Sequence, residues 1–208
     1  MDEVRSARVF LAVGISASIA GVIAERQRVI GKDAPDGLFR FADPAQAHVT
    51  LRFLGQRSSE EQTRIVRAAA AVARSASPFA LAFGGLGIFP DERRPHTLWM
   101  GLTAGRPELV VLAARLDTEL TEAGFAPEGR PYVPHLTLAR IKQHPPPGLM
   151  KKVLSGAIER GGTAGHAEST DVQLVDRFAL MESRATGVGV RYVPLQIFRL
   201  ETACTPSK

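Results

Sequence analysis

Cysteine is nearly absent from this sequence of 208 residues, in which Cys204, close to the C-terminus, is the only one. A single cysteine excludes an internal disulfide framework and any zinc site built mainly from cysteine. The sequence also lacks an apolar run long enough to cross a bilayer. It shows no convincing secretory signal, because Gly14 ends the short apolar run that begins at Val9. We therefore expect a cytoplasmic protein that does not associate with membranes.

Neither sign of charge is scarce, but bases outnumber acids. There are 26 Lys and Arg against 21 Asp and Glu, and the net charge is +5. Most of the bases are arginine, whose planar guanidinium suits phosphate recognition. Charge alone leaves open a basic protein with no nucleic-acid partner. With 45% hydrophobic and 23% charged residues, the composition is that of a globular protein with ample material for a core.

One four-residue motif occurs twice. The segment His48-Val49-Thr50-Leu51 is followed later in the chain by His135-Leu136-Thr137-Leu138. On a β-strand, successive side chains alternate between the two faces, so the His and the Thr of each copy point the same way and the apolar residues point into a core. Two such strands side by side would present two imidazoles and two hydroxyls to one cleft.

The surrounding pattern suggests that each motif belongs to one half of an approximate internal duplication. Helices are predicted at about 16–31, 58–76, 107–124 and 148–160, and strands at 8–13, 48–54, 79–83, 97–102, 133–141, 169–181 and 191–200. Gly84 to Pro95 reads as a connection, and Trp99 as a packing residue. We expect one bilobal α+β domain over residues 1–208. Two antiparallel-rich sheets with outer helices would flank a central cleft.

Two histidines in one cleft are suited to breaking a phosphodiester by acid–base catalysis. One neutral imidazole takes a proton from the nucleophile while the other, protonated, gives a proton to the leaving oxygen. Nearby threonine hydroxyls would stabilise the charge on the phosphoryl oxygens. Either histidine alone could instead be a core residue. A zinc site would need a third ligand at suitable spacing, and a serine or cysteine nucleophile has no supporting motif.

The sequence resembles the 2H phosphoesterase superfamily, and within it the RNA 2′,3′-cyclic phosphodiesterases, also named 2′-5′ RNA ligases. The resemblance lies in segments 48–55 and 130–140, and it continues at 8–13, 85–90 and 182–184. It implies a bilobal fold with pseudo-twofold symmetry and a reaction that needs no metal or cofactor. That reaction opens a terminal 2′,3′-cyclic phosphate to a 2′-phosphomonoester, and its reverse would join RNA ends.

The resemblance also implies roles for the motif residues. His48 would donate a proton to the departing 3′ oxygen, and His135 would be the base that activates water. Thr50 and Thr137 would hold the phosphate. The two motifs are too alike for the residues themselves to decide which histidine is the acid.

Four further residues are candidates for binding the substrate. Arg52 shares the face of His48 by strand parity, whereas Arg140 can reach the site only if its strand twists or bulges. Tyr132 and Phe41 are candidates for stacking on a terminal base, with a core or rim position as the alternative for both.

The expected partner is RNA with a 2′,3′-cyclic phosphate terminus, for example tRNA fragments, bound by a monomer. An alternative within the enzyme class is a phosphodiesterase for small cyclic nucleotides. A third possibility is a non-catalytic module that binds RNA ends, but that function would need one motif to be eroded, and both are intact.

Overall fold

The computed structural model describes residues 6–142, 145–160, 172–187 and 189–201. Cys204 and the start of the strand expected from Ser169 lie outside these ranges. No helix within them is long and apolar enough to span a membrane. The elements in chain order are β1 (Ala7–Gly14), α1 (Ala17–Asp33), β2 (Phe39–Phe41), a 3-10 turn (Pro44–Gln46), β3 (His48–Arg57), α2 (Ser59–Arg74), β4 (Phe79–Phe89), β5 (Thr97–Ala104), α3 (Arg106–Glu122), β6 (Leu136–Ile141), α4 (Leu149–Arg160), β7 (Val172–Val175), β8 (Arg177–Thr186) and β9 (Gly189–Arg199).

Local residues stabilise the starts of three of the helices. The Ser58 hydroxyl accepts the amide hydrogen of Glu61 at 3.3 Å, and the Glu61 carboxylate accepts that of Ser58 at 2.8 Å, so α2 starts with a capping box. The Ser16 hydroxyl caps α1 by accepting from the amide of Ile19. Pro107 lies in the first turn of α3, where no helical hydrogen bond needs its missing N–H.

The strands form one antiparallel sheet instead of the two that the sequence suggests. Their order is β7-β4-β5-β6-β3-β1-β8-β9, with β2 paired to β6. The halves join because Val49 of β3 pairs with Leu136 of β6, and both side chains are fully buried in one core. The α+β class is confirmed. The motif strands β3 and β6 are the two central strands of this order, with three strands on either side of them. The internal duplication itself stays a prediction.

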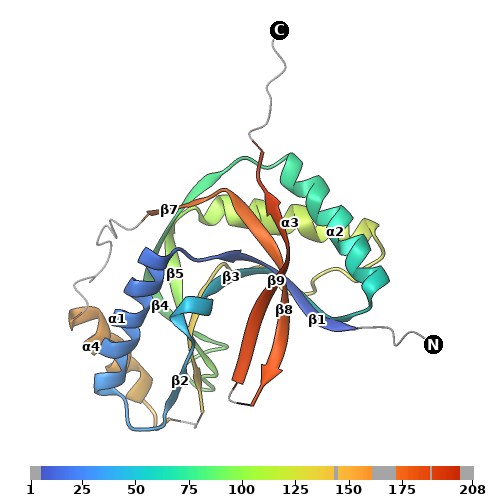
Figure 1. Ribbon diagram of the computed structural model, residues 1–208. Coiled ribbons are helices and arrows are strands. Elements are labelled where there is room, and N and C mark those ends of the chain that lie inside the picture. The colour runs from blue at the N-terminus through green and yellow to red at the C-terminus, as the bar shows by residue number, and fades with distance from the viewer. Residues whose placement is uncertain (1–5, 143–144, 161–171, 188, 202–208) are drawn as a thin grey trace.

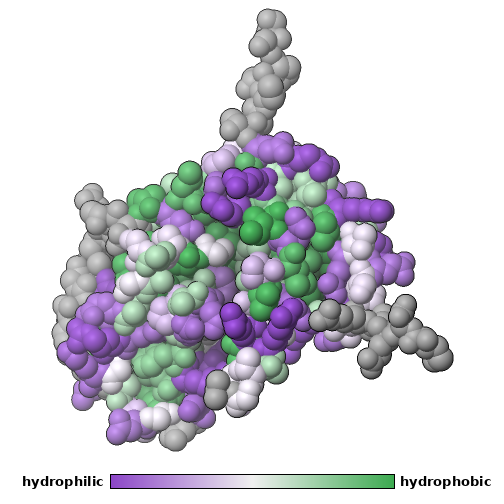
Figure 2. Space-filling model, viewed as in Figure 1, coloured by the Kyte–Doolittle hydropathy of each residue, from purple (hydrophilic) through white to green (hydrophobic). Residues whose placement is uncertain are grey.

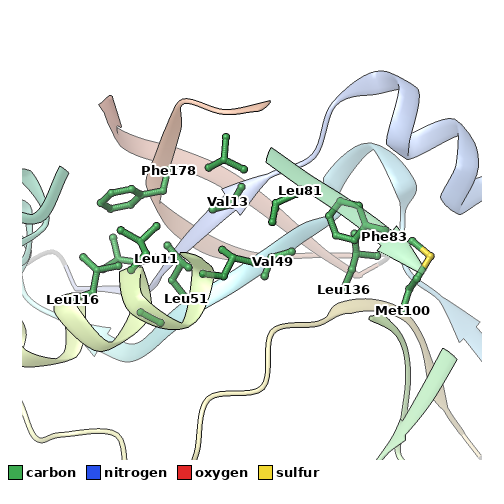
Figure 3. Close-up of a cluster of buried hydrophobic side chains, with 14 of the residues drawn as sticks. Leu11, Val13, Val49, Leu51, Leu81, Phe83, Met100, Leu116, Leu136 and Phe178 are labelled. Carbon is green, nitrogen blue, oxygen red and sulfur yellow. The ribbon is translucent and has the colours of Figure 1, made fainter. Parts of the chain in front are cut away.

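The helices pack in two pairs outside the curled sheet (Figure 1). Helix α1 contacts α4, and α2 contacts α3. The core lies between these helices and the sheet, where Figure 3 shows Leu11, Val49 and Leu51 gathered with Leu116 of α3. Because strand side chains alternate, the residues on either side of Val49 point to the opposite face of the sheet. We call that opposite face the motif face.

Some large apolar side chains remain exposed on the two edge strands of the sheet. They are Val172 and Leu174 in β7 and Val190, Leu195 and Ile197 in β9. On the side shown in Figure 2, the green apolar surface is broken up and bordered by purple polar surface. Scattered apolar exposure of this kind is common on globular proteins.

Strand β4 continues through the glycine-rich segment that the sequence predicts to be a connection. The register between β4 and β5 is irregular between Gly84 and Leu86, and Gly85 between them has a φ of +68°, as a bulge allows. Gly87 lies opposite Trp99, and a Cβ built on Gly87 would be 2.1 Å from the indole ring. The glycines therefore permit a bulge and the close approach of a large ring, rather than a loop.

Replacing Gly87 with alanine should displace the indole of Trp99 from β4. We expect a changed tryptophan emission spectrum and a loss of about 1–3 kcal/mol in the free energy of unfolding, because the added methyl overpacks the contact. Trp99 is the only tryptophan, so tryptophan fluorescence reports on the surroundings of this one residue. Gly129→Ala is the matched control, since a Cβ there meets nothing within 4 Å. An unchanged spectrum for Gly87→Ala would contradict this packing.

Candidate active site

The two motifs lie side by side because Val49 and Leu136 are paired. Strands β3 and β6 are antiparallel, so each motif histidine lies across from the threonine of the other motif. The two paired apolar residues are buried in the core, and their neighbours along each strand therefore point to the motif face. The structure thus brings together four partly exposed polar residues: His48, Thr50, His135 and Thr137.

Both imidazoles are held in the same way by the backbone. Nδ1 of His48 lies 2.9 Å from the carbonyl oxygen of Gln46, and Nδ1 of His135 lies 2.8 Å from that of Val133. A carbonyl oxygen only accepts, so Nδ1 carries a proton in each ring and donates it. In each neutral ring Nε2 is then the atom that can take up a proton, and in each charged ring it is the atom that can release one.

The protein lowers the pKa of both histidines below the ordinary value of 6.5. Burial is the main cause for His48, opposed by the hydrogen bond to Gln46 and reinforced by the charge of His135. Burial is also the main cause for His135, opposed by the hydrogen bond to Val133 and reinforced by the charge of Arg140. Both rings therefore favour the neutral form in the free protein.

Two aromatic rings surround His48 on the motif face. Its imidazole lies 5.0 Å from the ring of Phe10 and 4.8 Å edge-on from that of Tyr192, measured between ring centroids. Tyr192 is fixed in turn because its backbone N–H donates to the side-chain oxygen of Gln46 at 2.8 Å. Gln46 thus links strand β9 to the same short segment that holds His48. Sequence reasoning missed Tyr192, since nothing in the sequence places β9 beside the first motif.

Two other rings surround His135. Its imidazole lies 4.9 Å edge-on from Phe89 and 6.1 Å from Trp99, and these two rings stack on one another at 4.9 Å. The sequence predicts Trp99 to be a packing residue, and it does pack, but against a motif histidine. Each imidazole therefore has one aromatic wall, which excludes water from one side of the ring and supports the lowered pKa.

A bulge brings Arg140 to the motif face. In the β5–β6 register Trp99 pairs with Thr137 and Thr97 pairs with Arg140, so Leu138 is one residue extra on β6. The extra residue reverses the strand parity beyond it, and Arg140 therefore points the same way as Thr137. Its guanidinium donates to the Thr97 hydroxyl. The condition that the sequence sets for Arg140, a bulge in its strand, is met.

The same kind of bulge moves Arg52 away from the site. The β1–β3 register skips one residue at Leu51, and Arg52 pairs with Leu11, whose side chain is in the core. Arg52 therefore points towards the helices, where its guanidinium lies 3.1 Å from Asp117 of α3 and 2.9 Å from Glu128. Only 8% of its side chain is exposed. The parity argument that put Arg52 beside His48 is wrong, because it assumed an unbroken strand.

Beyond the first bulge it is Phe53 that shares the face of Thr50. Phe10 pairs with Phe53 and Ala12 with Thr50, and residues two apart on β1 share a face. Phe53 is 60% exposed although it is large and apolar. It occupies the position in the first motif strand that Arg140 occupies in the second. The two motifs therefore present different side chains beyond their threonines, which sequence reasoning missed because the bulges are not visible in it.

The two residues expected to stack on a base lie in other surroundings. The Tyr132 hydroxyl donates to the carbonyl oxygen of Thr50 at 2.9 Å, its ring packs against the core, and burial raises its pKa. Phe41 pairs with Ala139, which is in the core, and its ring lies 3.5 Å from a Cβ built on Gly31 of α1. Phe41 is thus on the helix side, so stacking by these two rings stays a prediction without support from the geometry.

Two surface depressions lie elsewhere and contain no histidine. One is lined by Ile15, Ala17, Ala20, Asp43, Pro44 and Ala45, and the other by residues of α2 and the end of α3. Within the described ranges, no three His, Cys, Asp or Glu side chains are grouped as metal ligands would be. The two motif histidines, His48 and His135, both lie on the motif face. We therefore take the motif face as the candidate active site.

Comparison with known proteins identifies the class to which this fold and this pair of motifs belong. The sequence profile of the 2′-5′ RNA ligase superfamily matches residues 18–183. The chain belongs to that superfamily, and the resemblance noted in its sequence is confirmed.

Named relatives narrow the likeness within the superfamily. The chain is 29% identical over 196 residues to the RNA 2′,3′-cyclic phosphodiesterase of Methanothermobacter thermautotrophicus, covering 93% of this chain and 98% of the relative. It is 32% identical over 132 residues to the protein of the same name from Bacillus subtilis, covering 63% and 69%. The fold matches that of LigT from E. coli, solved in complex with 3′-AMP, with a TM-score of 0.73, 23% identity and coverage of 95% and 100%.

The lowered pKa values predict an acidic optimum for any reaction that needs one neutral and one protonated histidine. The fraction of protein in that state is greatest between the two pKa values, and both lie below 6.5. We therefore expect kcat/KM, which reports on the free protein, to be greatest below pH 6.5. A profile measured in buffers of constant ionic strength tests this. A maximum above the ordinary pKa of imidazole would contradict it.

Arg52 should matter for stability and Arg140 for activity. Arg52→Ala removes the buried guanidinium that pairs with Asp117 and Glu128, whose side chains are 30% and 33% exposed, and we expect a loss of about 1.5–3 kcal/mol in the free energy of unfolding. Arg140→Ala should unfold like the wild-type protein but turn over more slowly. Arg28→Ala is the control for an exposed ion pair, expected to cost less than about 1 kcal/mol. Denaturant titration and initial rates separate the two effects, and the assignment fails if Arg52→Ala is as stable as Arg28→Ala.

Proposed function

We propose that this protein is an RNA 2′,3′-cyclic phosphodiesterase that opens the cyclic phosphate to a 2′-phosphomonoester. One observation carries the proposal: two histidines with the same backbone anchor at Nδ1 lie on one face, each across from the threonine of the other motif. Membership of the 2′-5′ RNA ligase superfamily and the names of the relatives support it. The natural substrates are RNA ends, for example tRNA fragments, and the protein acts as a cytoplasmic monomer.

In the proposed mechanism the histidines exchange protons through Nε2. His135 takes a proton from water, the water oxygen attacks phosphorus, and the bond between phosphorus and the 3′ oxygen breaks. His48 gives its Nε2 proton to that 3′ oxygen. The phosphate stays on the 2′ oxygen, so a 2′-phosphomonoester and a free 3′-hydroxyl result. Each acid or base step is worth about 10²–10⁴ in rate.

The surroundings of the two histidines support this assignment of roles. A base must be neutral before the reaction, and the positive charge of Arg140 favours the neutral form of His135. For His48, the charge that lowers the pKa is that of His135, and not that of an arginine. A bound phosphate anion would raise the pKa of the neighbouring imidazole and so favour the protonated acid. His48 is therefore the better donor once the substrate is present.

The threonines complete the proposed site. Thr50 and Thr137 flank the paired Val49 and Leu136 on the motif face, so their hydroxyls lie on either side of the place where the phosphate would be held. Hydroxyl donors at this place stabilise the charge that develops on the phosphoryl oxygens. The reaction as proposed needs no metal ion. Run in reverse, the same groups would join a cyclic phosphate to a 5′-hydroxyl, as a 2′-5′ ligase does.

Removing either motif histidine should abolish most of the activity while the fold is retained. We expect His48→Ala and His135→Ala each to lower kcat by about 10²–10⁴ on an RNA ending in a 2′,3′-cyclic phosphate. His96→Ala is the matched control, because His96 is exposed and outside both motifs. Near-full activity of either motif variant would refute the two-histidine mechanism.

EDTA should leave the wild-type rate unchanged, because the proposed reaction needs no metal ion. Activity that is lost in EDTA and restored by zinc or manganese would indicate a metal-dependent enzyme.

The same assay decides between the proposed function and its alternatives. A phosphodiesterase for small cyclic nucleotides would favour the cyclic mononucleotide over the RNA. A non-catalytic RNA-end module would bind the RNA and leave the cyclic phosphate intact. We expect instead that RNA is turned over in preference to the mononucleotide, with binding that weakens as salt rises.

A further inference from the structure

Arg40 lies directly opposite Arg140 on the motif face. The two residues are cross-strand partners in the β2–β6 ladder. Directly opposed residues of an antiparallel pair point to the same side of the sheet. The neighbours of Arg40 along β2 confirm which side this is, since Phe39 packs against the core and Phe41 lies near α1. Arg40 therefore points away from the helices, like Arg140.

This pair of arginines carries two positive charges that no described carboxylate neutralises. The ion pairs within the described ranges engage other arginines, and Arg140 donates to the neutral hydroxyl of Thr97. Both arginines are exposed. Like charges placed directly opposite one another are unfavourable in a sheet, and an anion bound between them removes that penalty. The geometry is that of a site for an oxyanion with several acceptor atoms.

The arginine pair is displaced along β6 from the paired motif residues. Arg140 is four residues beyond Leu136 on β6, and one of those residues is in the bulge, so the arginine pair lies roughly 10 Å along the strand from the Val49–Leu136 pair. Arg140, on the motif strand itself, can reach back towards Thr137. Arg40, on the separate strand β2, is on the far side of Arg140 from β5.

We propose that Arg40, together with Arg140, binds the phosphodiester immediately upstream of the cyclic phosphate. This rests on the proposed function and deepens it, because it names the substrate as an oligoribonucleotide end. A nucleic acid strand carries one negative charge per nucleotide, whereas a cyclic mononucleotide has no charge beyond its reacting phosphate. Phe53, at the matching position of the other motif strand, offers an apolar surface where Arg140 offers a cation. The upstream chain is therefore directed to the His135 side of the site.

The experiment compares two substrates in the wild-type protein and in Arg40→Ala. The first is a diribonucleotide that ends in a 2′,3′-cyclic phosphate, and the second is the corresponding cyclic mononucleotide. We expect Arg40→Ala to lower kcat/KM for the diribonucleotide by roughly 10- to 100-fold relative to the mononucleotide, as the loss of a charge-assisted contact does. The slope of log kcat/KM against log salt concentration for the diribonucleotide should become shallower by about 0.7.

A third substrate tests the contact itself. In a diribonucleotide whose upstream linkage is a neutral methylphosphonate, the wild-type protein should lose the same factor, and Arg40→Ala should lose nothing further. Arg67→Ala is the control, since Arg67 is an exposed arginine on α2, which packs on the opposite side of the sheet. It should leave the ratio between substrates unchanged.

The outcomes separate this inference from the function on which it rests. If neither substrate is opened by the wild-type protein, the proposed function fails. If both are opened and Arg40→Ala slows them equally, Arg40 acts on the reacting phosphate and the inference is overturned. It is also overturned if Arg40→Ala changes neither rate, or if the methylphosphonate costs the variant as much as the wild-type protein.

Discussion

The pairing of Val49 with Leu136 is the interaction on which the rest of the structure depends. It joins the two halves of the sheet and buries the middle residue of each motif in one core. Because side chains alternate along a strand, burial of these two residues turns all four polar motif residues to the other face. A shift of either strand by one residue would place the histidines in the core instead. The site is therefore specified by the packing of the core, and not by contacts among the polar residues.

Two similar motifs produce a site whose sides differ. The imidazoles share the same anchor at Nδ1 and the same kind of aromatic wall, and burial lowers the pKa of both. The bulge after each threonine then presents Phe53 on one side and Arg140 on the other. This difference gives one histidine a cationic neighbour that favours its neutral form. Symmetric local geometry with an asymmetric field is what an acid and a base need if they are to begin the reaction in opposite protonation states.

The spacing of apolar residues predicts the four helices, and the repeated His-x-Thr pattern predicts the motif strands and the face that the motif residues share. Parity failed beyond the threonines, since a bulge depends on the pairing of neighbouring strands and leaves no mark in the motif. Parity therefore predicts the wrong face for Arg52. For Arg140 the sequence predicts the motif face only on the condition that β6 twists or bulges, and the structure contains that bulge. The sequence also does not show that the glycine-rich segment continues β4, because the indole that Gly87 accommodates comes from another strand.

The position of the phosphate in the product tests the central claim most directly. An RNA with a defined 2′,3′-cyclic phosphate end would be incubated with the protein, and the product identified by phosphorus NMR and by its resistance or sensitivity to enzymes specific for 3′-phosphates. With His48 as the donor to the 3′ oxygen and His135 as the base, the account predicts a 2′-phosphomonoester. A 3′-phosphomonoester would contradict the leaving-group assignment, and an intact cyclic phosphate would contradict catalysis by the paired motifs altogether.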